Sequence, residues 1–156
     1  MIRLRPAEQS DAASVFEWRN DPWIVSLSTS GQSVKREQHD AWFSRMLDRE
    51  HHLFWIIESR CGEGMGIVKV DLAPDQTAVI TAYLLKLFIG KGRGPEAIIL
   101  ATQKAFEQWP ELKCINAFIR PENDRSIRAF SRVGFVEDSK GDARNEVKMS
   151  IYRPKN

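Results

Sequence analysis

A glycine-rich loop is the part of this sequence whose residue types and spacing point most directly to chemistry. Residues 90–94 read Gly-Lys-Gly-Arg-Gly, and Pro95 follows, a residue that suits the first turn of a helix. Glycine tolerates a positive φ and lets the backbone approach a ligand closely. The first amides of a helix bind anions, and the helix dipole adds to the attraction. The loop therefore predicts a cradle for a phosphate or pyrophosphate group.

Two common phosphate-binding motifs do not fit this loop. A P-loop needs GxxxxGK followed by Ser or Thr, and a dinucleotide fingerprint needs G-x-G-x-x-G. The spacing in this chain is G-x-G-x-G. A plain strand-to-helix turn without a ligand stays open as the alternative, because a glycine motif alone is a weak signal.

The loop also resembles a motif of the GNAT superfamily of acetyl-CoA-dependent N-acetyltransferases. That motif reads R/Q-x-x-G-x-G/A and lies between the fourth strand and the following helix. Gly92 and Gly94 stand at its glycine positions, while Ile89 stands where the family has Arg or Gln. The backbone cradle does not depend on that first side chain.

Two further stretches share the resemblance, which covers about the whole chain. The later family segment reads N-x-x-S-x-x-x-Y-x-x-x-G-F, and Phe130 replaces its Tyr. The matching positions are Asn123, Ser126, Gly134 and Phe135. The segments at 18–21, 39–43 and 65–71 are similar to a subset of the superfamily, the acetyltransferases of nucleotide-linked 4-amino sugars.

The resemblance implies acetyl-CoA as a co-substrate and no metal ion. It places the CoA pyrophosphate on the amides of the glycine loop and pairs the pantetheine arm with the preceding strand like an added strand. A backbone N–H of that strand would polarise the thioester carbonyl. The cofactor-binding positions implied in this way are Leu84, Leu85, Leu87, Ile89, Gly90, Lys91, Gly92, Arg93, Gly94, Asn123, Ser126 and Phe130.

Acetyl transfer to an amine requires a held acyl donor, a neutral amine and a stabilised thiolate. The family often protonates the thiolate with a Tyr at the position of Phe130, which has no proton to donate. Tyr83 shares a strand face with Thr81 and lies near the expected meeting point of acceptor and thioester. His39 and Asp71 complete the candidate catalytic set. Each candidate also has a purely structural interpretation, in side-chain packing or in a turn.

The segment around residue 20 is dense in groups that could bind an acceptor. Arg19 suits the phosphate of a nucleotide sugar, and Trp23 suits stacking on its base or sugar. Asn20 is the third predicted acceptor-binding residue, with helix capping as the structural alternative. The acceptor pocket is expected between two loops, at about 19–34 and 139–145, because loops carry specificity.

Hydrophobic periodicity predicts the elements that position these residues. Strands are expected at 1–5, 53–57, 66–72, 78–88, 113–119 and 146–152, and helices at 12–18, from 33 to about 47, at 96–109 and at 126–133. Ser10-Asp11 should cap the first helix, Pro22 should close it, and 26–33 should be a polar loop. This order predicts an α+β fold with a mixed, mostly antiparallel sheet and helices on both faces.

Composition excludes several classes of protein. The chain has 156 residues, of which 42% are hydrophobic and 28% charged, so we expect one domain over 1–156. A net charge of +2 without a basic and aromatic stripe argues against nucleic-acid binding. No apolar stretch approaches the ~20 residues of a membrane span. The distant Cys61 and Cys114, with no apolar leader, predict a cytoplasmic location.

The functional hypothesis is acetyl transfer to the primary amine of a small acceptor, with a nucleotide-linked amino sugar as the candidate. A protein N-terminus, an aminoglycoside and a polyamine stay open, although a polyamine site needs clustered carboxylates and 26–33 has none. A catalytically weak, CoA-binding regulatory domain is the alternative that Ile89 and Phe130 favour. A homodimer formed by sheet extension through the last strand also stays open.

Overall fold

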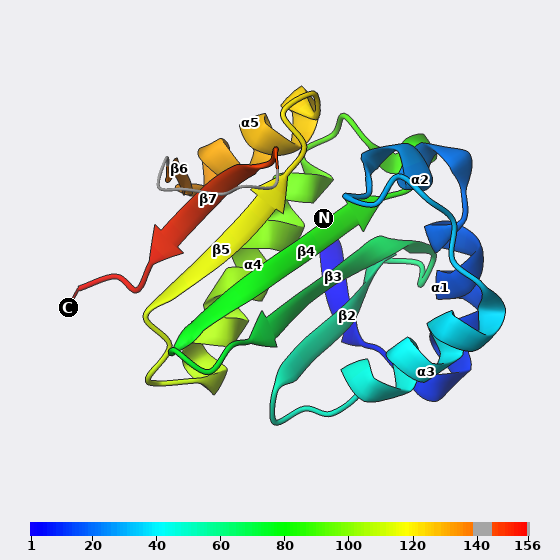
Figure 1. The fold of residues 1–156 in the computed structure, drawn as a ribbon, viewed down its shortest axis with the longest axis horizontal. Helices are drawn as coiled ribbons and strands as arrows, with labels where there is room; N and C mark the ends of the chain where they lie inside the picture. The colour runs from blue at the N-terminus through cyan, green and yellow to red at the C-terminus, as the bar shows by residue number, and fades with distance from the viewer. Residues whose placement is uncertain (139–144, 156) are drawn as a thin grey trace.

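The computed structural model describes residues 1–138 and 145–155 and contains a seven-stranded sheet (Figure 1). The strand order is β1-β2-β3-β4-β5-β7-β6. The strands are β1 (Ile2–Pro6), β2 (His52–Ser59), β3 (Gly64–Leu72), β4 (Thr77–Leu84), β5 (Cys114–Ile119), β6 (Val136–Glu137) and β7 (Val147–Tyr152). Of the described pairings, β4 with β5 is parallel and the others are antiparallel. The predicted α+β class is confirmed.

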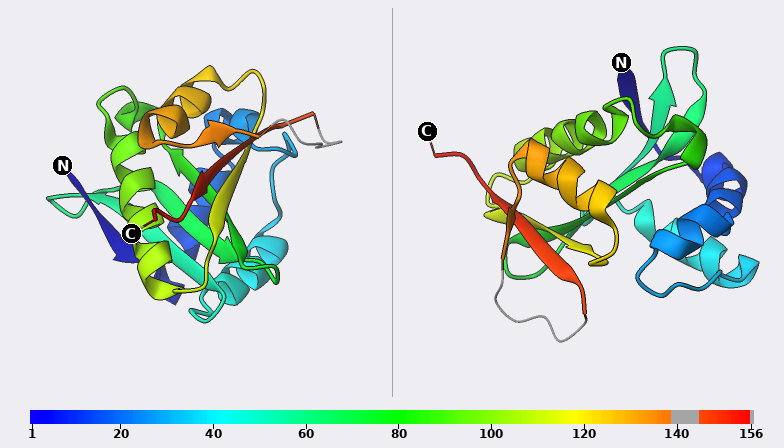
Figure 2. Two further views of the ribbon diagram at one scale, coloured as in Figure 1. Left: turned by 90° about the vertical axis from the view of Figure 1, so that its left-hand side faces the viewer. Right: turned by 90° about the horizontal axis from the view of Figure 1, so that it is seen from above.

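Helices cover both faces of this sheet (Figure 2). They are α1 (Ala12–Arg19), α2 (Pro22–Leu27), α3 (Arg36–Met46), α4 (Arg93–Gln108) and α5 (Asp124–Val133). Strand β2 is buried from Leu53 to Glu58, as expected for a strand with both faces covered. Its alternate residues enter two separate cores, one beneath α4 and α5 and one beneath α1 and α3. None of the described helices is long and apolar enough to cross a membrane.

Helix α4 packs against the sheet with a row of alanines on its buried face. Ala97, Ala101 and Ala105 are each 0% exposed and recur every four residues. A methyl side chain at each turn leaves little between the helix and the strands. This packing holds the helix N-terminus at the end of the sheet where β4 finishes.

The predicted strand over 78–88 is wrong in its last part. Strand β4 ends at Leu84, and residues Lys86–Phe88 form a 3-10 turn. The N–H of Leu85 still donates to the carbonyl of Met65, at 2.9 Å. Strand β3 begins at Gly64, so it offers no pairing partner to the residues after Leu85. The chain therefore leaves the sheet there and turns toward the glycine loop.

The first helix ends at Arg19, before Pro22 as expected, but the short helix α2 that follows was not predicted. It begins at Pro22: the Asp21 carboxylate accepts the N–H of Trp23 at 2.8 Å, and Pro22 occupies the first turn. The expected side-chain cap of α1 is wrong. Asp11 does not cap α1 with its side chain. Its carboxylate accepts the N–H of Glu8 and pairs with Arg5 at 2.8 Å.

The last long strand, β7, is not at the edge of the sheet, where a dimer formed by sheet extension would need it. Strand β7 lies inside the sheet, with β5 on one side and the unpredicted β6 on the other. The outer edge of β7 pairs at Ser150 and Met149, and its Lys148 carbonyl accepts the N–H of Asp138 at 2.8 Å. These contacts occupy the edge that sheet extension in a homodimer would need.

Strands β4 and β5 pair over three residues only and then separate. The paired residues are Thr77–Val79 and Cys114–Asn116. From Ile80 to Leu84, β4 pairs with β3 on one side and with no described strand on the other. The sheet is therefore open between its two central strands, at the end where α4 begins.

Gly66 sets the distance between β3 and β4 beside this opening. A Cβ added to Gly66 would lie 2.1 Å from the carbonyl oxygen of Tyr83 and 2.9 Å from the Cα of Leu84. We expect Gly66→Ala to force the strands apart and to lower the free energy of unfolding by about 1–3 kcal/mol. Urea denaturation measures this change.

Gly94→Ala is the matched control for this experiment. Its new Cβ would meet only the Cδ1 of Leu84, at the ordinary contact distance of 3.9 Å. An unchanged unfolding midpoint for Gly66→Ala would contradict the packing argument.

Candidate active site

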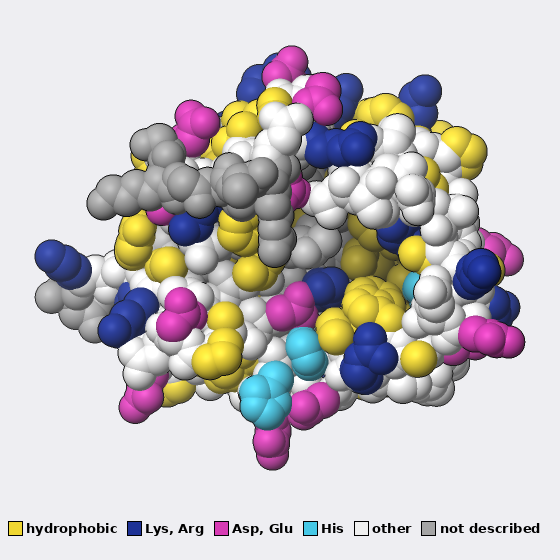
Figure 3. Space-filling view, viewed as in Figure 1, with side chains coloured by type: hydrophobic (Ala, Val, Ile, Leu, Met, Phe, Trp, Pro, Cys, Tyr) yellow, Lys and Arg dark blue, Asp and Glu magenta, His cyan; other side chains and the backbone are white. Residues whose placement is uncertain are grey.

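A cavity of about 940 Å³ occupies the opening between β4 and β5. Figure 3 shows a hollow near the middle of this face, with hydrophobic side chains inside it and basic side chains nearby. Segments from both faces of the sheet contribute to its lining. The predicted site residues that line it are Arg19, Trp23, His39, Thr81, Tyr83, Leu84, Ile89, Gly94, Asn123, Ser126 and Phe130.

The glycine loop presents free backbone donors at the end of this cavity. Gly90 and Gly92 have φ values of 88° and 76°, and Gly92 is the N-cap of α4. Among the described residues, nothing accepts a hydrogen bond from the N–H groups of Arg93 and Gly94. Glu96 is the first residue to donate into the helix, to the Gly92 carbonyl at 3.2 Å. The arrangement suits an anion that takes up the unpaired amides.

The cations of this loop have different surroundings. Arg93 donates from Nη1 to the carbonyl of Phe88 at 3.2 Å, and its guanidinium lies over the Phe88 ring, 5.8 Å from the centroid. It therefore holds the 3-10 turn against the helix. Lys91 is exposed and is free to reach an anion in solution.

The open edge of β4 is offset from the position that the sequence suggested. The N–H of Leu85 is committed to Met65, and Leu87 is 83% exposed on the 3-10 turn. N–H groups alternate between the two sides of a strand. The N–H groups of Ala82 and Leu84 therefore point away from β3, into the opening. An extended ligand would pair with residues 80–84 and not with 85–87.

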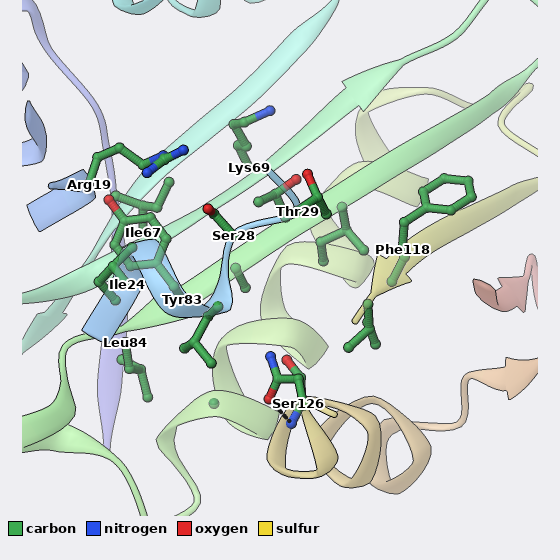
Figure 4. Close-up of a pocket in the computed structure, with 18 of the residues that line it drawn as sticks. Arg19, Ile24, Ser28, Thr29, Ile67, Lys69, Tyr83, Leu84, Phe118 and Ser126 are labelled. Atoms are coloured by element: carbon green, nitrogen blue, oxygen red, sulfur yellow. Dashed lines mark hydrogen bonds between the residues drawn. The ribbon is translucent and has the colours of Figure 1, made fainter. Parts of the chain in front are cut away.

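The N-terminus of α5 forms the opposite border of the cavity. The side-chain oxygen of Asn123 accepts the N–H of Ser126 at 3.2 Å, drawn as a dashed line in Figure 4. Phe130 is 3% exposed and packs edge-on against Phe135, with ring centroids 5.0 Å apart. Phe130 thus lines the cavity with an apolar ring and supplies no proton.

Polar atoms without partners gather on the α1 and α2 side of the cavity. Buried atoms with no described hydrogen-bond partner include Arg19 Nη1, Trp23 Nε1 and the Tyr83 hydroxyl. Figure 4 shows the Tyr83 hydroxyl directed toward the Arg19 guanidinium. Burial raises the pKa of Tyr83 well above its usual value, and the positive charge of Arg19 opposes this shift only in part. Tyr83 therefore keeps its proton and can donate it in a hydrogen bond. Thr81, on the same strand, is exposed to the cavity.

His39 lies in an aromatic cluster at the cavity wall. It is 3% exposed, and the ring centroids of Phe16, Trp42 and Phe43 lie within 5.9 Å of its own. Neither ring nitrogen has a described partner. Burial lowers the pKa of His39, which favours the neutral imidazole.

Eight predicted site residues are not part of the cavity lining. Six of them belong to the predicted cofactor-binding set: Leu85, Leu87, Gly90, Lys91, Gly92 and Arg93. The other two are Asp71 and Asn20. Asp71 pairs with Lys69 and with the ring of His52, the latter at 2.7 Å. Asn20 uses its amide to hold the backbone of Val34, accepting its N–H at 2.7 Å and donating to its carbonyl at 2.9 Å. Asn20 therefore fixes the segment that follows α2, and its contacts are structural.

Glu146 is a cavity residue that the sequence analysis did not single out. It precedes β7, whose Val147 pairs with Ile119 of β5. This pairing brings Glu146 to the cavity, where its Oε2 is buried and has no described hydrogen-bond partner. The sequence showed only a carboxylate at the start of a strand. Of the predicted second acceptor loop, residues 139–144 lie outside the described residues.

One cluster of metal-binding side chains occurs among the described residues, away from this cavity. Asp48, Glu50 and His51 are all exposed and lie close together after α3. None of them lines the cavity.

Known proteins share this fold over nearly its whole length. Spermidine N-acetyltransferase from Vibrio cholerae, solved with CoA and spermine, gives a TM-score of 0.83 at 17% identity and covers 97% of this chain and 95% of that one. Aminoglycoside acetyltransferase AAC(6')-Ib with coenzyme A gives 0.83 at 21% identity, covering 98% and 95%. A domain from Methanocaldococcus jannaschii gives 0.84 at 25% identity, covering 98% and 99%.

Sequence comparisons extend this likeness. The uncharacterized protein MJ1062 of Methanocaldococcus jannaschii is 27% identical over 147 residues, which are 90% of this chain and 29% of that protein. The chain thus spans less than a third of this relative's length. A family model described as an acetyltransferase (GNAT) domain matches residues 2–136. Because that match covers most of its 156 residues, the chain belongs to the GNAT acetyltransferase domain family.

Proposed function

We propose that this protein transfers the acetyl group of acetyl-CoA to the primary amine of a small acceptor, by direct attack in a ternary complex. The observation that carries the proposal is the unpaired edge of β4 beside the unpaired first amides of α4. An extended chain that ends in a pyrophosphate satisfies both sets of donors at once.

On the donor side, the CoA pyrophosphate takes the amides of Arg93 and Gly94. Gly90 and Gly92 leave space for it, because a Cβ built on either would find no atom within 4 Å. The pantetheine amides pair with residues 80–84, and the Leu84 N–H donates to the thioester carbonyl. Two of the structural neighbours were solved with CoA bound, which supports this assignment.

On the acceptor side, the amine enters between α2 and the start of β7. The thiolate that leaves is a tolerable leaving group, so a side-chain acid is not essential at the position of Phe130. Tyr83 is the proton-bearing group nearest in chain position to the proposed thioester site, and its burial keeps it protonated. Thr81 lies on the same strand face.

The acceptor that the N-terminal half of the sequence suggests is a nucleotide-linked amino sugar. The unpaired Nη1 of Arg19 and Nε1 of Trp23 at the cavity support this choice, since guanidinium and indole groups bind phosphates and bases or sugars. The free Cys61 and Cys114 support a reducing, cytoplasmic setting. The spermidine and aminoglycoside enzymes share the fold and leave the acceptor of this chain open.

The test of this function combines calorimetric titration of acetyl-CoA with a thiol-release assay in the same buffer. The assay compares nucleotide-linked amino sugars, peptides, aminoglycosides and polyamines. We expect binding of acetyl-CoA and release of CoA with one class of amine. Binding without release for any amine would contradict acetyl transfer and favour a regulatory CoA-binding domain.

A second test concerns the phosphate cradle. We expect Gly92→Val to weaken acetyl-CoA binding at least about tenfold, because a β-branched residue is strained at a φ of 76° and would disturb the helix start whose amides are proposed to bind the phosphates. Titration calorimetry measures the dissociation constant.

Gly62→Val is the matched control, because Gly62 has a φ of 85°, also has no atom within 4 Å of an added Cβ, and lies in the turn between β2 and β3. It imposes a similar backbone strain away from the cavity and should leave the affinity unchanged. Equal affinity of the Gly92→Val and wild-type proteins would remove the cradle assignment.

A further inference from the structure

The described side chains that line the cavity carry a strong excess of positive charge. Its basic residues come from five different elements or their ends: Arg19, Arg45, Lys69, Arg120 and Arg125. Glu146 is the one carboxylate in that lining among the described residues. Lys69 pairs with Asp71, whereas the four arginines form no ion pair with any described carboxylate. A cavity of this kind disfavours a polycation and attracts an anion.

Arg19 is the arginine of this set whose surroundings most clearly require a ligand. Its Nη1 is buried without a partner, and its Nη2 reaches only the Ser30 hydroxyl, at 3.4 Å. An uncompensated guanidinium in a partly buried site is costly, and a carboxylate or phosphate compensates it with two parallel hydrogen bonds. The indole N–H of Trp23 and the hydroxyl of Tyr83 are further free donors on the same side.

Glu146 is an acidic residue of this mostly basic cavity lining and lies where β5 pairs with β7. Its Oε2 is buried and without a described partner, and no described cation pairs with it. An ionised carboxylate in such a place gains most from a positively charged hydrogen-bond donor. The ammonium group of an acceptor supplies this donor and must lose a proton before it can react.

We propose that the acceptor is an amine that also carries a phosphate or carboxylate group, with its anion bound by Arg19 and its amine bound and deprotonated by Glu146. This inference rests on the proposed acetyl transfer and names its substrate class and its base. It excludes spermidine and aminoglycosides, the polycationic substrates, as the preferred acceptors of this chain.

The proton balance of this step is simple. The ammonium group transfers one proton to the Glu146 carboxylate, and the freed lone pair forms the C–N bond at the thioester carbonyl. The C–S bond then breaks, and its electron pair stays on sulfur. The second proton of the nitrogen goes to the thiolate, so the products are an amide and CoA with a free thiol. Glu146 returns its proton to solvent.

The first experiment compares matched acceptors in the thiol-release assay with the wild-type protein. Amino sugar phosphates are paired with the free amino sugars, and amino acids with their amides, while spermidine and kanamycin serve as polycations. We expect the anionic member of a pair to have a kcat/KM at least about tenfold higher. A polycation as the best acceptor would overturn the proposal.

The second experiment separates the two binding groups with substitutions. Glu146→Gln should lower kcat by about 100-fold or more, the usual contribution of a general base, with the affinity for acetyl-CoA unchanged. Arg19→Gln should instead raise the acceptor KM at least about tenfold. Glu137→Gln, at an exposed residue of β6, is the matched control and should behave as the wild-type protein.

A third readout distinguishes a base from a residue that only supports the fold. An anionic alkoxyamine is already neutral near pH 7 and does not need deprotonation. We expect the loss of kcat in Glu146→Gln to be much smaller with this acceptor than with the corresponding alkylamine. An equal loss with both would contradict the role as a base.

The failure of this inference is distinguishable from the failure of acetyl transfer itself. If acetyl-CoA binds and no amine releases CoA, the proposed function fails. Calorimetric titration of the paired amines into the CoA complex then decides the charge preference alone. Tighter binding of the neutral or polycationic members would overturn it, and tighter binding of the anionic members would sustain it.

Discussion

The separation of β4 from β5 is the constraint on which the rest of this structure depends. The two parallel strands pair over Thr77–Val79 and Cys114–Asn116 and then diverge, so backbone donors and acceptors of β4 stay unpaired inside the sheet. Unpaired backbone groups away from water are costly, and native proteins seldom leave them without a partner. The small inner residues of α4 bring the helix N-terminus to the same opening. One ligand with amides and a phosphate meets both needs.

The side chains around this opening are arranged to receive a ligand and not to bond with one another. Arg19, Trp23, Tyr83, His39 and Glu146 all hold buried polar atoms without described partners. In a fully satisfied core such atoms would be paired, because each unpaired one costs stability. Their concentration at one cavity, with the unpaired Arg19 Nη1 on the α1 side and the unpaired Glu146 Oε2 on the β7 side, is the basis for proposing a ligand of mixed charge.

Much of this arrangement was predictable from local sequence. The glycine loop predicted the helix that follows it and the positive φ angles of its glycines, and the helix expected at 126–133 corresponds to α5, which begins two residues earlier, at Asp124. The predictions failed at positions whose structure depends on which distant strand they pair with. The mostly apolar residues 85–88 were expected to continue β4, but β3 begins at Gly64 and reaches no further along β4 than Leu85. Glu146 carried no local signal, since only the pairing of Val147 with Ile119 brings it to the cavity.

The measurement that tests the central claim most directly is amide hydrogen exchange at Ala82 and Leu84, with and without saturating acetyl-CoA. These amides face the opening, whereas those of Thr81 and Tyr83 face β3 and serve as internal references. The account predicts that acetyl-CoA slows exchange at Ala82 and Leu84 and leaves the two references unchanged. Exchange at Ala82 and Leu84 that stays the same under saturating acetyl-CoA would contradict it.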